Sequence, residues 1–261
     1  TSPFAFTGNK FEFRMVGSSD SISSPNVVLN TIAAEAFKEA ADILEKAEDF
    51  DTAVHDMIKE QLAAHRRIIF NGNGYADAWV EEAEMRGLPN IKSMVEAIPA
   101  LTTEASVRMF EAFNVFTKAE LESRVEIEYE AYSKAINIEA RTMIDMAGKQ
   151  IIPAAVKYAT MLADSLSKVQ TACPDADVSV QAELLTETSA YLSDMKVALA
   201  NLTDVTEKCG IIENNKEQAN AYHDIVVPAM EALRAPADKL EMMVDKELWP
   251  MPSYGDLIFE V

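Results

Sequence analysis

Three charged residues near the N-terminus have the types and the spacing that binding chemistry requires. Lys10, Glu12 and Arg14 alternate with apolar residues, and such a period of two predicts a β-strand with all three charged groups on one side. A carboxylate between two cations can ligate a divalent metal ion while the cations hold phosphate or carboxylate oxygens. Ion pairs with a neighbouring strand explain the same spacing equally well, so both interpretations stay open.

Other signatures of catalysis are weak in this sequence. The three histidines, His55, His65 and His223, do not have the spacing of a zinc site, and no nucleophile turn or phosphate-binding Gly-rich motif occurs. The loop Asn71–Gly74 contains two asparagines and two glycines. Its backbone amides could bind an anion, but a signal that ends a helix is the favoured interpretation.

The charge balance excludes two classes of partner. The chain has 43 Asp and Glu against 23 Lys and Arg, a net charge of -20. Such a surface repels nucleic acids and anionic lipid head groups, so we expect neither nucleic acid nor membrane as a partner. No apolar run approaches the roughly 20 residues of a membrane-spanning helix and no signal-peptide pattern begins the chain, so a cytoplasmic location is expected. Cys173 and Cys209 are too few for a disulfide framework, and both are expected to be reduced.

Low counts of glycine and proline, 8 and 10 in 261 residues, predict a mainly α fold. The helices expected in the first half cover residues 27–48, 52–69 and 77–87, followed by short helices between 91 and 117 that Pro99 and Asn114 interrupt. Ser24 before Pro25 predicts the N-cap of the first of these helices, and Asp77 that of the third.

The second half has the more regular pattern. One apolar seam has spacings that alternate strictly between four and three, and its members are Leu184, Thr188, Tyr191, Met195, Ala198, Leu202, Val205 and Cys209. A helix before it has a stripe at Leu121, Val125, Glu128, Tyr132, Ala135, Met143 and Ala147, another covers residues 153–171, and a returning helix covers 222–244. Short connections make such helices antiparallel neighbours, so residues 118–248 predict an antiparallel helical bundle.

Several stretches resemble type III glutamine synthetases. They are the N-terminal stretch that contains the strand and runs on to Ser24-Pro-Asn-Val-Val-Leu-Asn-Thr31, then Phe70-Asn-Gly-Asn-Gly-Tyr75, Asn114-Val-Phe-Thr117, Ser133-Lys-Ala-Ile-Asn-Ile-Glu-Ala140, Thr142-Met-Ile-Asp-Met146, and Trp249-Pro250 with Ser253-Tyr-Gly-Asp-Leu257. The resemblance covers nearly the whole chain and implies a C-terminal piece of a longer protein. Residues 1–50 would end the catalytic domain with a strand and a helix, 51–117 would form a helical connecting region, and 118–261 would form the C-terminal bundle and tail.

The same resemblance implies an activity and roles for the strand. Glutamine synthetases ligate glutamate and ammonia through a γ-glutamyl phosphate, with ATP and Mg²⁺ or Mn²⁺, and ring-shaped homo-oligomers are expected. Carried over by position, Glu12 would ligate the metal, Arg14 would contact the glutamate side-chain carboxylate or its phosphate, and Lys10 would lie on the nucleotide side. Lys10 stands where types I and II have Arg. The other metal ligands of the family lie upstream, so the piece alone is expected to be inactive.

A second class of function stays open beside this one. In it the chain is a non-catalytic helical module that mediates oligomer assembly or binds a regulator, and the strand is scaffolding. Residues 118–248 show no recognisable chemistry, which favours such a role for that stretch. The two hypotheses are compatible because they concern different parts of the chain.

Overall fold

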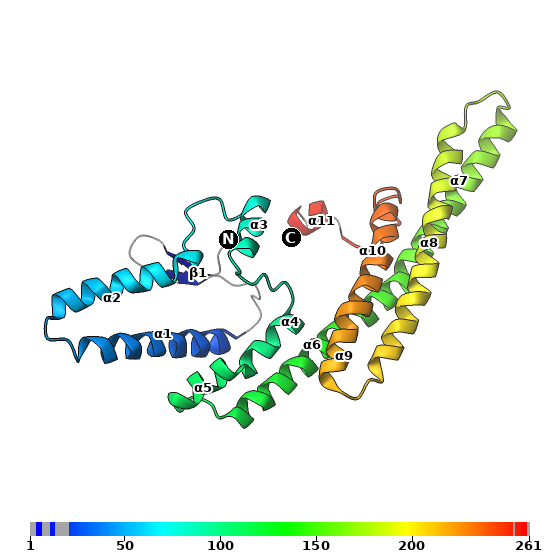
Figure 1. Cartoon of the computed structure of the whole chain (residues 1–261). Helices are drawn as coiled ribbons and strands as arrows, with labels where there is room; N and C mark the ends of the chain where they lie inside the picture. Colours follow the sequence, from blue (N-terminus) through cyan, green and yellow to red (C-terminus); the bar gives the residue numbers. More distant parts are fainter. Residues whose placement is uncertain (1–3, 7–10, 14–20, 253, 260–261) are drawn as a thin grey trace. The chain divides into compact units, whose positions relative to one another are not determined.

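The chain is mainly α-helical, as its composition predicts. The computed structural model describes residues 4–6, 11–13, 21–252 and 254–259. The chain divides into two compact units, Thr1–Val125 and Glu126–Val261 (Figure 1).

The N-terminal unit combines a small β-hairpin with short and medium helices. Its elements are β1 (Phe4–Phe6), β2 (Phe11–Phe13), α1 (Ser23–Leu44), α2 (Phe50–Ala64), the 3-10 turn η1 (Arg66–Ile68), α3 (Asp77–Met85), α4 (Met94–Ala97), the 3-10 turn η2 (Ile98–Thr102) and α5 (Glu104–Ala112). The strands pair antiparallel. Helices α1 and α2 form an antiparallel helix hairpin (Figure 1).

Local signals in the sequence explain where most of these helices begin and end. Asp49 accepts the backbone N–H of Thr52 and so caps α2. At the end of α5, Asn114 takes a left-handed conformation with φ 52°, and asparagine tolerates this conformation better than most residues. The break expected at Asn114 is therefore confirmed. The cap expected at Ser24 is wrong by two residues, because α1 already begins at Ser23 and its N-cap Ile22 makes no side-chain bond.

The expected cap of the third helix is also displaced. Ala76 occupies the N-cap position of α3, and Asp77 is the first residue inside the helix. An acidic side chain in the first turn interacts favourably with the helix dipole without capping a backbone amide, so Asp77 still suits the position. The end expected at Gly87 is confirmed, since this glycine has φ 68°.

The C-terminal unit is a bundle of long helices. The helix α6 (Lys118–Met146) enters it and continues through the π-helical turn η3 (Ala147–Ile151) into α7 (Ile152–Ala172). The chain then returns through α8 (Ser179–Gly210), α9 (Asn215–Ala221), the π-helical turn η4 (Tyr222–Val226), α10 (Val227–Glu241) and α11 (Tyr254–Phe259). Helix α8 packs antiparallel against α7 and also contacts α10, as the expected bundle requires (Figure 1).

Each π turn ends two residues before a proline. Ile152 and Val227 donate their backbone N–H groups five residues back, to the carbonyls of Ala147 and Tyr222. Pro153 and Pro228 follow, and each lacks an N–H and crowds the carbonyl four residues earlier. The wider π turn relieves this crowding without ending the helix. The interruption expected near Ile151 is therefore a change of helix type within one continuous rod.

The core of the C-terminal unit follows the predicted seam closely. Thr188, Met195, Leu202 and Cys209 are buried, and the other predicted members are partly buried. The helix predicted over 222–244 is confirmed as far as Glu241, where α10 ends. The buried residues of this stretch are Tyr222, Val226, Ala229, Leu233, Leu240 and, beyond the helix, Val244. In α6 the predicted stripe is partly wrong: Ala135 is exposed, whereas Tyr129, Ser133 and Ala140 are buried. Ser133, Ala140 and Ala147 follow one another in steps of seven, and the predicted Glu128 lies one residue before the buried Tyr129.

Candidate functional site

The predicted binding strand coincides in part with β2. In the hairpin Phe4 pairs with Phe13, Ala5 with Glu12, and Phe6 with Phe11. Lys10 and Arg14 lie outside the described residues. The residue directly opposite Glu12 is thus an alanine, which offers no countercharge for a ladder of ion pairs across this hairpin. The role of Glu12 itself stays a prediction.

A second constellation surrounds the loop Asn71–Gly74. The rings of Phe70 and Trp79 stack with centroids 3.8 Å apart. The Arg86 guanidinium lies 5.3 Å from the Trp79 ring centroid and 6.0 Å from that of Phe70. Its Nη1 donates to the backbone carbonyls of Arg67, at 3.1 Å, and Ile69, at 2.9 Å, and Nη2 pairs with Glu82. The side chain of the residue directly after α3 therefore holds the segment that leads into the loop.

These contacts explain why α2 is shorter than predicted. The sequence predicts a helix to residue 69, but α2 ends at Ala64 and a 3-10 turn follows. Arg86 captures the carbonyls of Arg67 and Ile69, which gives this backbone hydrogen bonds outside a helix. The loop Asn71–Gly74 was expected to end this helix, but the 3-10 turn η1 and the segment held by Arg86 lie between the end of α2 and the loop.

The loop itself has little freedom. A Cβ on Gly72 would lie 2.5 Å from Cζ of Phe70, so only glycine fits beside the stacked ring. The Asn73 side chain accepts the N–H of Tyr75 at 3.1 Å, and its carbonyl accepts that of Ala76 at 3.2 Å. The Phe70 ring before the loop and the Asn73 side chain within it therefore restrain the loop.

Sequence reasoning missed the residues that build this loop. A usable signal was present, because Trp79 in α3 and Arg86, the residue that caps the C-terminus of α3, are seven positions apart, about two helical turns. A large aromatic and a cation on one face of a short helix beside a Gly-rich loop suit a clamp on backbone carbonyls.

The described part of the chain contains no group of three or more His, Cys, Asp or Glu residues placed to hold a metal ion. Two histidines lie beside an acid: His55 beside Asp56, and His223, whose Nδ1 is 2.7 Å from Asp224. Both cysteines are free, and burial raises the pKa of the Cys209 thiol.

No helix among the described residues combines the length and the apolarity needed to cross a membrane.

Comparison with known proteins gives this architecture a family. A model of the glutamine synthetase C-terminal domain matches residues 53–170. This match covers the loop Asn71–Gly74, the Arg86 clamp, and the start of the helical bundle. The chain belongs to the glutamine synthetase family and corresponds to a C-terminal portion of it.

Individual relatives agree with this assignment. The chain is 36% identical over 267 residues to a glutamine synthetase of Bacteroides fragilis, covering 99% of this chain and 37% of that protein. A protein of Dictyostelium discoideum named type-3 glutamine synthetase is 35% identical over 269 residues, covering 99% of this chain and 36% of that protein. The chain thus spans little more than a third of the length of these relatives, and the resemblance to type III proteins is confirmed.

Proposed function

We infer that this chain acts as the C-terminal part of an ATP-dependent glutamate–ammonia ligase. The observation that carries the proposal is the likeness to glutamine synthetases along 99% of the chain. In this proposal residues 1–50, with the β1–β2 hairpin, complete the catalytic domain. The intact enzyme is a cytoplasmic ring-shaped homo-oligomer that uses glutamate, ammonia, ATP and Mg²⁺ or Mn²⁺.

Within the proposal the strand around β2 supplies one edge of the active site. Glu12 ligates a metal ion, which neutralises charge on the phosphates during transfer. Arg14 holds the glutamate side-chain carboxylate or its phosphate, and Lys10 faces the nucleotide. The backbone of Glu12 pairs with that of Ala5, whose methyl side chain carries no charge. One carboxylate cannot hold the metal ions of such a site, so the chain alone is inactive.

The substitution Glu12→Gln in the full-length enzyme tests the assignment of the strand. It keeps the volume and removes the charge, so we expect a fall of more than about a hundredfold in kcat, the scale for losing a preorganised electrostatic group. Raised Mg²⁺ or Mn²⁺ should restore part of the rate, because weakened metal binding responds to mass action. Glu60→Gln, at an exposed position of α2, is the matched control. Wild-type kinetics with an unchanged metal requirement in Glu12→Gln would remove this residue from the site.

A role in assembly or regulation is the second proposal, and it concerns the C-terminal bundle. A core cluster that joins α6, α8 and α10 supports it, because a bundle with its own core can act as a rigid module. Removing residues 118–261 from the full-length enzyme should abolish ring assembly together with activity, as measured by light scattering and turnover. Loss of activity with assembly intact would instead assign the bundle to the catalytic centre.

A further inference from the structure

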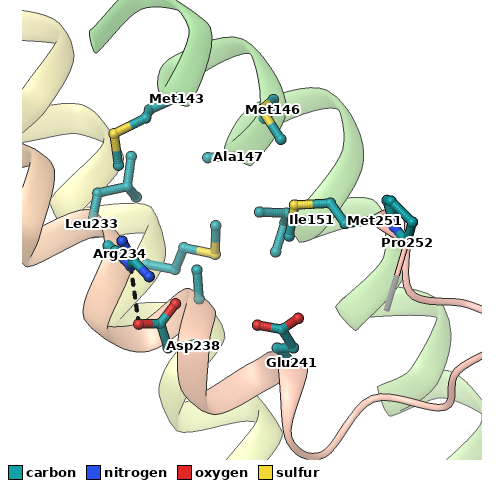
Figure 2. A pocket seen from close by; sticks show the side chains of 12 residues that line it. Met143, Met146, Ala147, Ile151, Leu233, Arg234, Asp238, Glu241, Met251 and Pro252 are labelled. Atoms are coloured by element: carbon teal, nitrogen blue, oxygen red, sulfur yellow. Dashed lines mark hydrogen bonds and ion pairs between the residues drawn. The ribbon is translucent and has the colours of Figure 1, made fainter. Parts of the chain in front are cut away.

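A methionine-rich pocket opens in the C-terminal unit, away from the predicted binding strand. It has a volume of about 320 Å³ and lies between the end of α6 with η3, α8, α10 and the segment after α10. Four thioethers line it: Met143, Met146, Met195 and Met251. Figure 2 shows side chains from α6 and α10 facing each other across the space, with Met251 and Pro252 at one side.

The inner wall of the pocket is apolar. Ala147, Ile151 and Leu233 are buried and complete the surface that the methionines begin. Methionine is flexible and polarisable, so such a wall adjusts to ligands of different shape. The volume equals about ten water molecules at about 30 Å³ each and lies at the small end of ligand pockets. The wall therefore suits a short hydrocarbon chain.

The mouth of the pocket carries an excess of negative charge. Arg234 Nε donates to Asp238 Oδ2 at 3.2 Å, so these two charges neutralise each other. Glu241 is the third charged residue of the lining, and Figure 2 shows it extending from α10 toward the space. An apolar interior below an exposed carboxylate is complementary to a ligand with a hydrocarbon body and a cationic head.

We propose that this pocket binds a short primary alkylammonium ion, with the alkyl chain among the methionines and the ammonium group at Glu241. The binding geometry uses residues of the C-terminal unit alone and does not depend on the proposed ligase activity. The ammonium group stays partly hydrated at the mouth, because Arg234 and Asp238 are largely exposed there. Its attraction to Glu241 therefore sets selectivity more than affinity.

Nuclear magnetic resonance of methionine methyl groups in the whole 261-residue chain tests the proposal. The chain, labelled at its methionine methyls, is titrated with n-hexylammonium, n-hexanol and n-hexanoate. We expect n-hexylammonium to shift the signals of Met143, Met146, Met195 and Met251, while those of the exposed Met85 and Met161 do not move. The order of affinity should be ammonium, then alcohol, then carboxylate. Shifts spread equally over the exposed methionines, or no shift in the pocket, would overturn the proposal.

Two pairs of variants separate the wall from the mouth. Glu241→Gln should lower the affinity for n-hexylammonium about twofold to fivefold, the range for an exposed charge pair, without changing the affinity for n-hexanol. Glu231→Gln, exposed on the same helix, should change neither. Ala237→Met should fill the pocket and remove binding of both probes, whereas Ala232→Met at an exposed position should not. If n-hexanol or n-hexanoate binds the unmodified chain as tightly as n-hexylammonium, the cationic specificity is wrong, whatever the variants do.

Discussion

The two units bury their apolar side chains to different extents, although both are built from amphipathic helices. In the C-terminal unit Met195, Leu202 and Leu233 are essentially inaccessible to water. In the N-terminal unit the hairpin of α1 and α2 leaves Phe37 75% exposed and Leu62 55% exposed. Helical periodicity of similar quality therefore gives a closed core in one unit and an uncovered surface in the other. A periodic apolar pattern therefore predicts a helix, but whether the apolar face is buried depends on the other elements that pack against it.

The largest effect that this comparison predicts is at the centre of α8. Leu202→Asp places a charge where no partner exists, so we expect a loss of about 4 kcal/mol or more in the free energy of unfolding of the C-terminal unit. Val197→Asp, at a position of the same helix that is 68% exposed, should change little. Chemical denaturation followed by circular dichroism measures both. Equal effects in the two variants would mean that the core is not closed.

The next effect concerns the stacked cluster of Phe70 and Trp79 in the N-terminal unit. Gly72→Ala brings a methyl group against the Phe70 ring, which cannot move freely because it stacks on Trp79. We expect a cost of about 1–3 kcal/mol, typical of overpacking, with a change in tryptophan fluorescence. Gly74→Ala is the matched control, since a Cβ there meets nothing within 4 Å. Identical behaviour of the two alanine variants would show that the stacked cluster does not restrain the loop.

A smaller effect is expected where α6 begins. The Glu120 carboxylate accepts the backbone N–H of Thr117 at 2.8 Å and its hydroxyl at 2.9 Å, and the Thr117 hydroxyl accepts the N–H of Glu120 at 3.3 Å. This reciprocal pair is a capping box. Thr117→Ala should cost about 1 kcal/mol, measured by thermal unfolding, and Thr117→Ser should recover most of it. A serine variant as unstable as the alanine variant would argue against the hydroxyl as the cap.

The same cap predicts a dependence on pH. The hydrogen bonds from the Thr117 backbone and then from its hydroxyl lower the pKa of Glu120 below its ordinary value. A lowered pKa in the folded state stabilises the protein above the ordinary carboxyl pKa, and this contribution disappears as pH falls through the lowered value. The difference between wild type and Glu120→Gln should therefore shrink on acidification. A difference that grows toward low pH would contradict this assignment.

The smallest effect tests the uncovered hairpin. Leu62→Gln on α2 removes apolar surface that already faces water, so the unfolding free energy of the chain should change by no more than about 0.5 kcal/mol. Lys59→Gln, also exposed on α2, provides the reference. A large destabilisation by Leu62→Gln would show that the surface is covered, and the contrast between the two units would fail.

Some features of this fold could be predicted from the sequence, and others could not. The seam from Leu184 to Cys209 could be predicted from the sequence because it lies in one helix and keeps one spacing throughout. The stripe of α6 could not be placed as well, since Glu128 and Tyr129 both fit a helical face and only tertiary packing selects the tyrosine. The clamp of Arg86 on the carbonyls of Arg67 and Ile69 joins residues 19 and 17 positions apart, beyond the reach of local patterns. The π turns before Pro153 and Pro228 were equally hidden, because a proline signal does not say whether a helix ends or widens.

Those two π turns have a consequence for changes in chain length. Elsewhere in a helix, a deletion of one residue turns everything after it by about 100° and moves the buried stripe to another face. A π turn already accommodates one more residue than an α turn, so a one-residue deletion within Ala147–Ile151 can be absorbed by conversion to α-helix with the flanking stripes still aligned. The cost that remains is the crowding at Pro153. The π turns at Ala147–Ile151 and Tyr222–Val226 are thus positions inside the long helices where this bundle tolerates the loss of one residue.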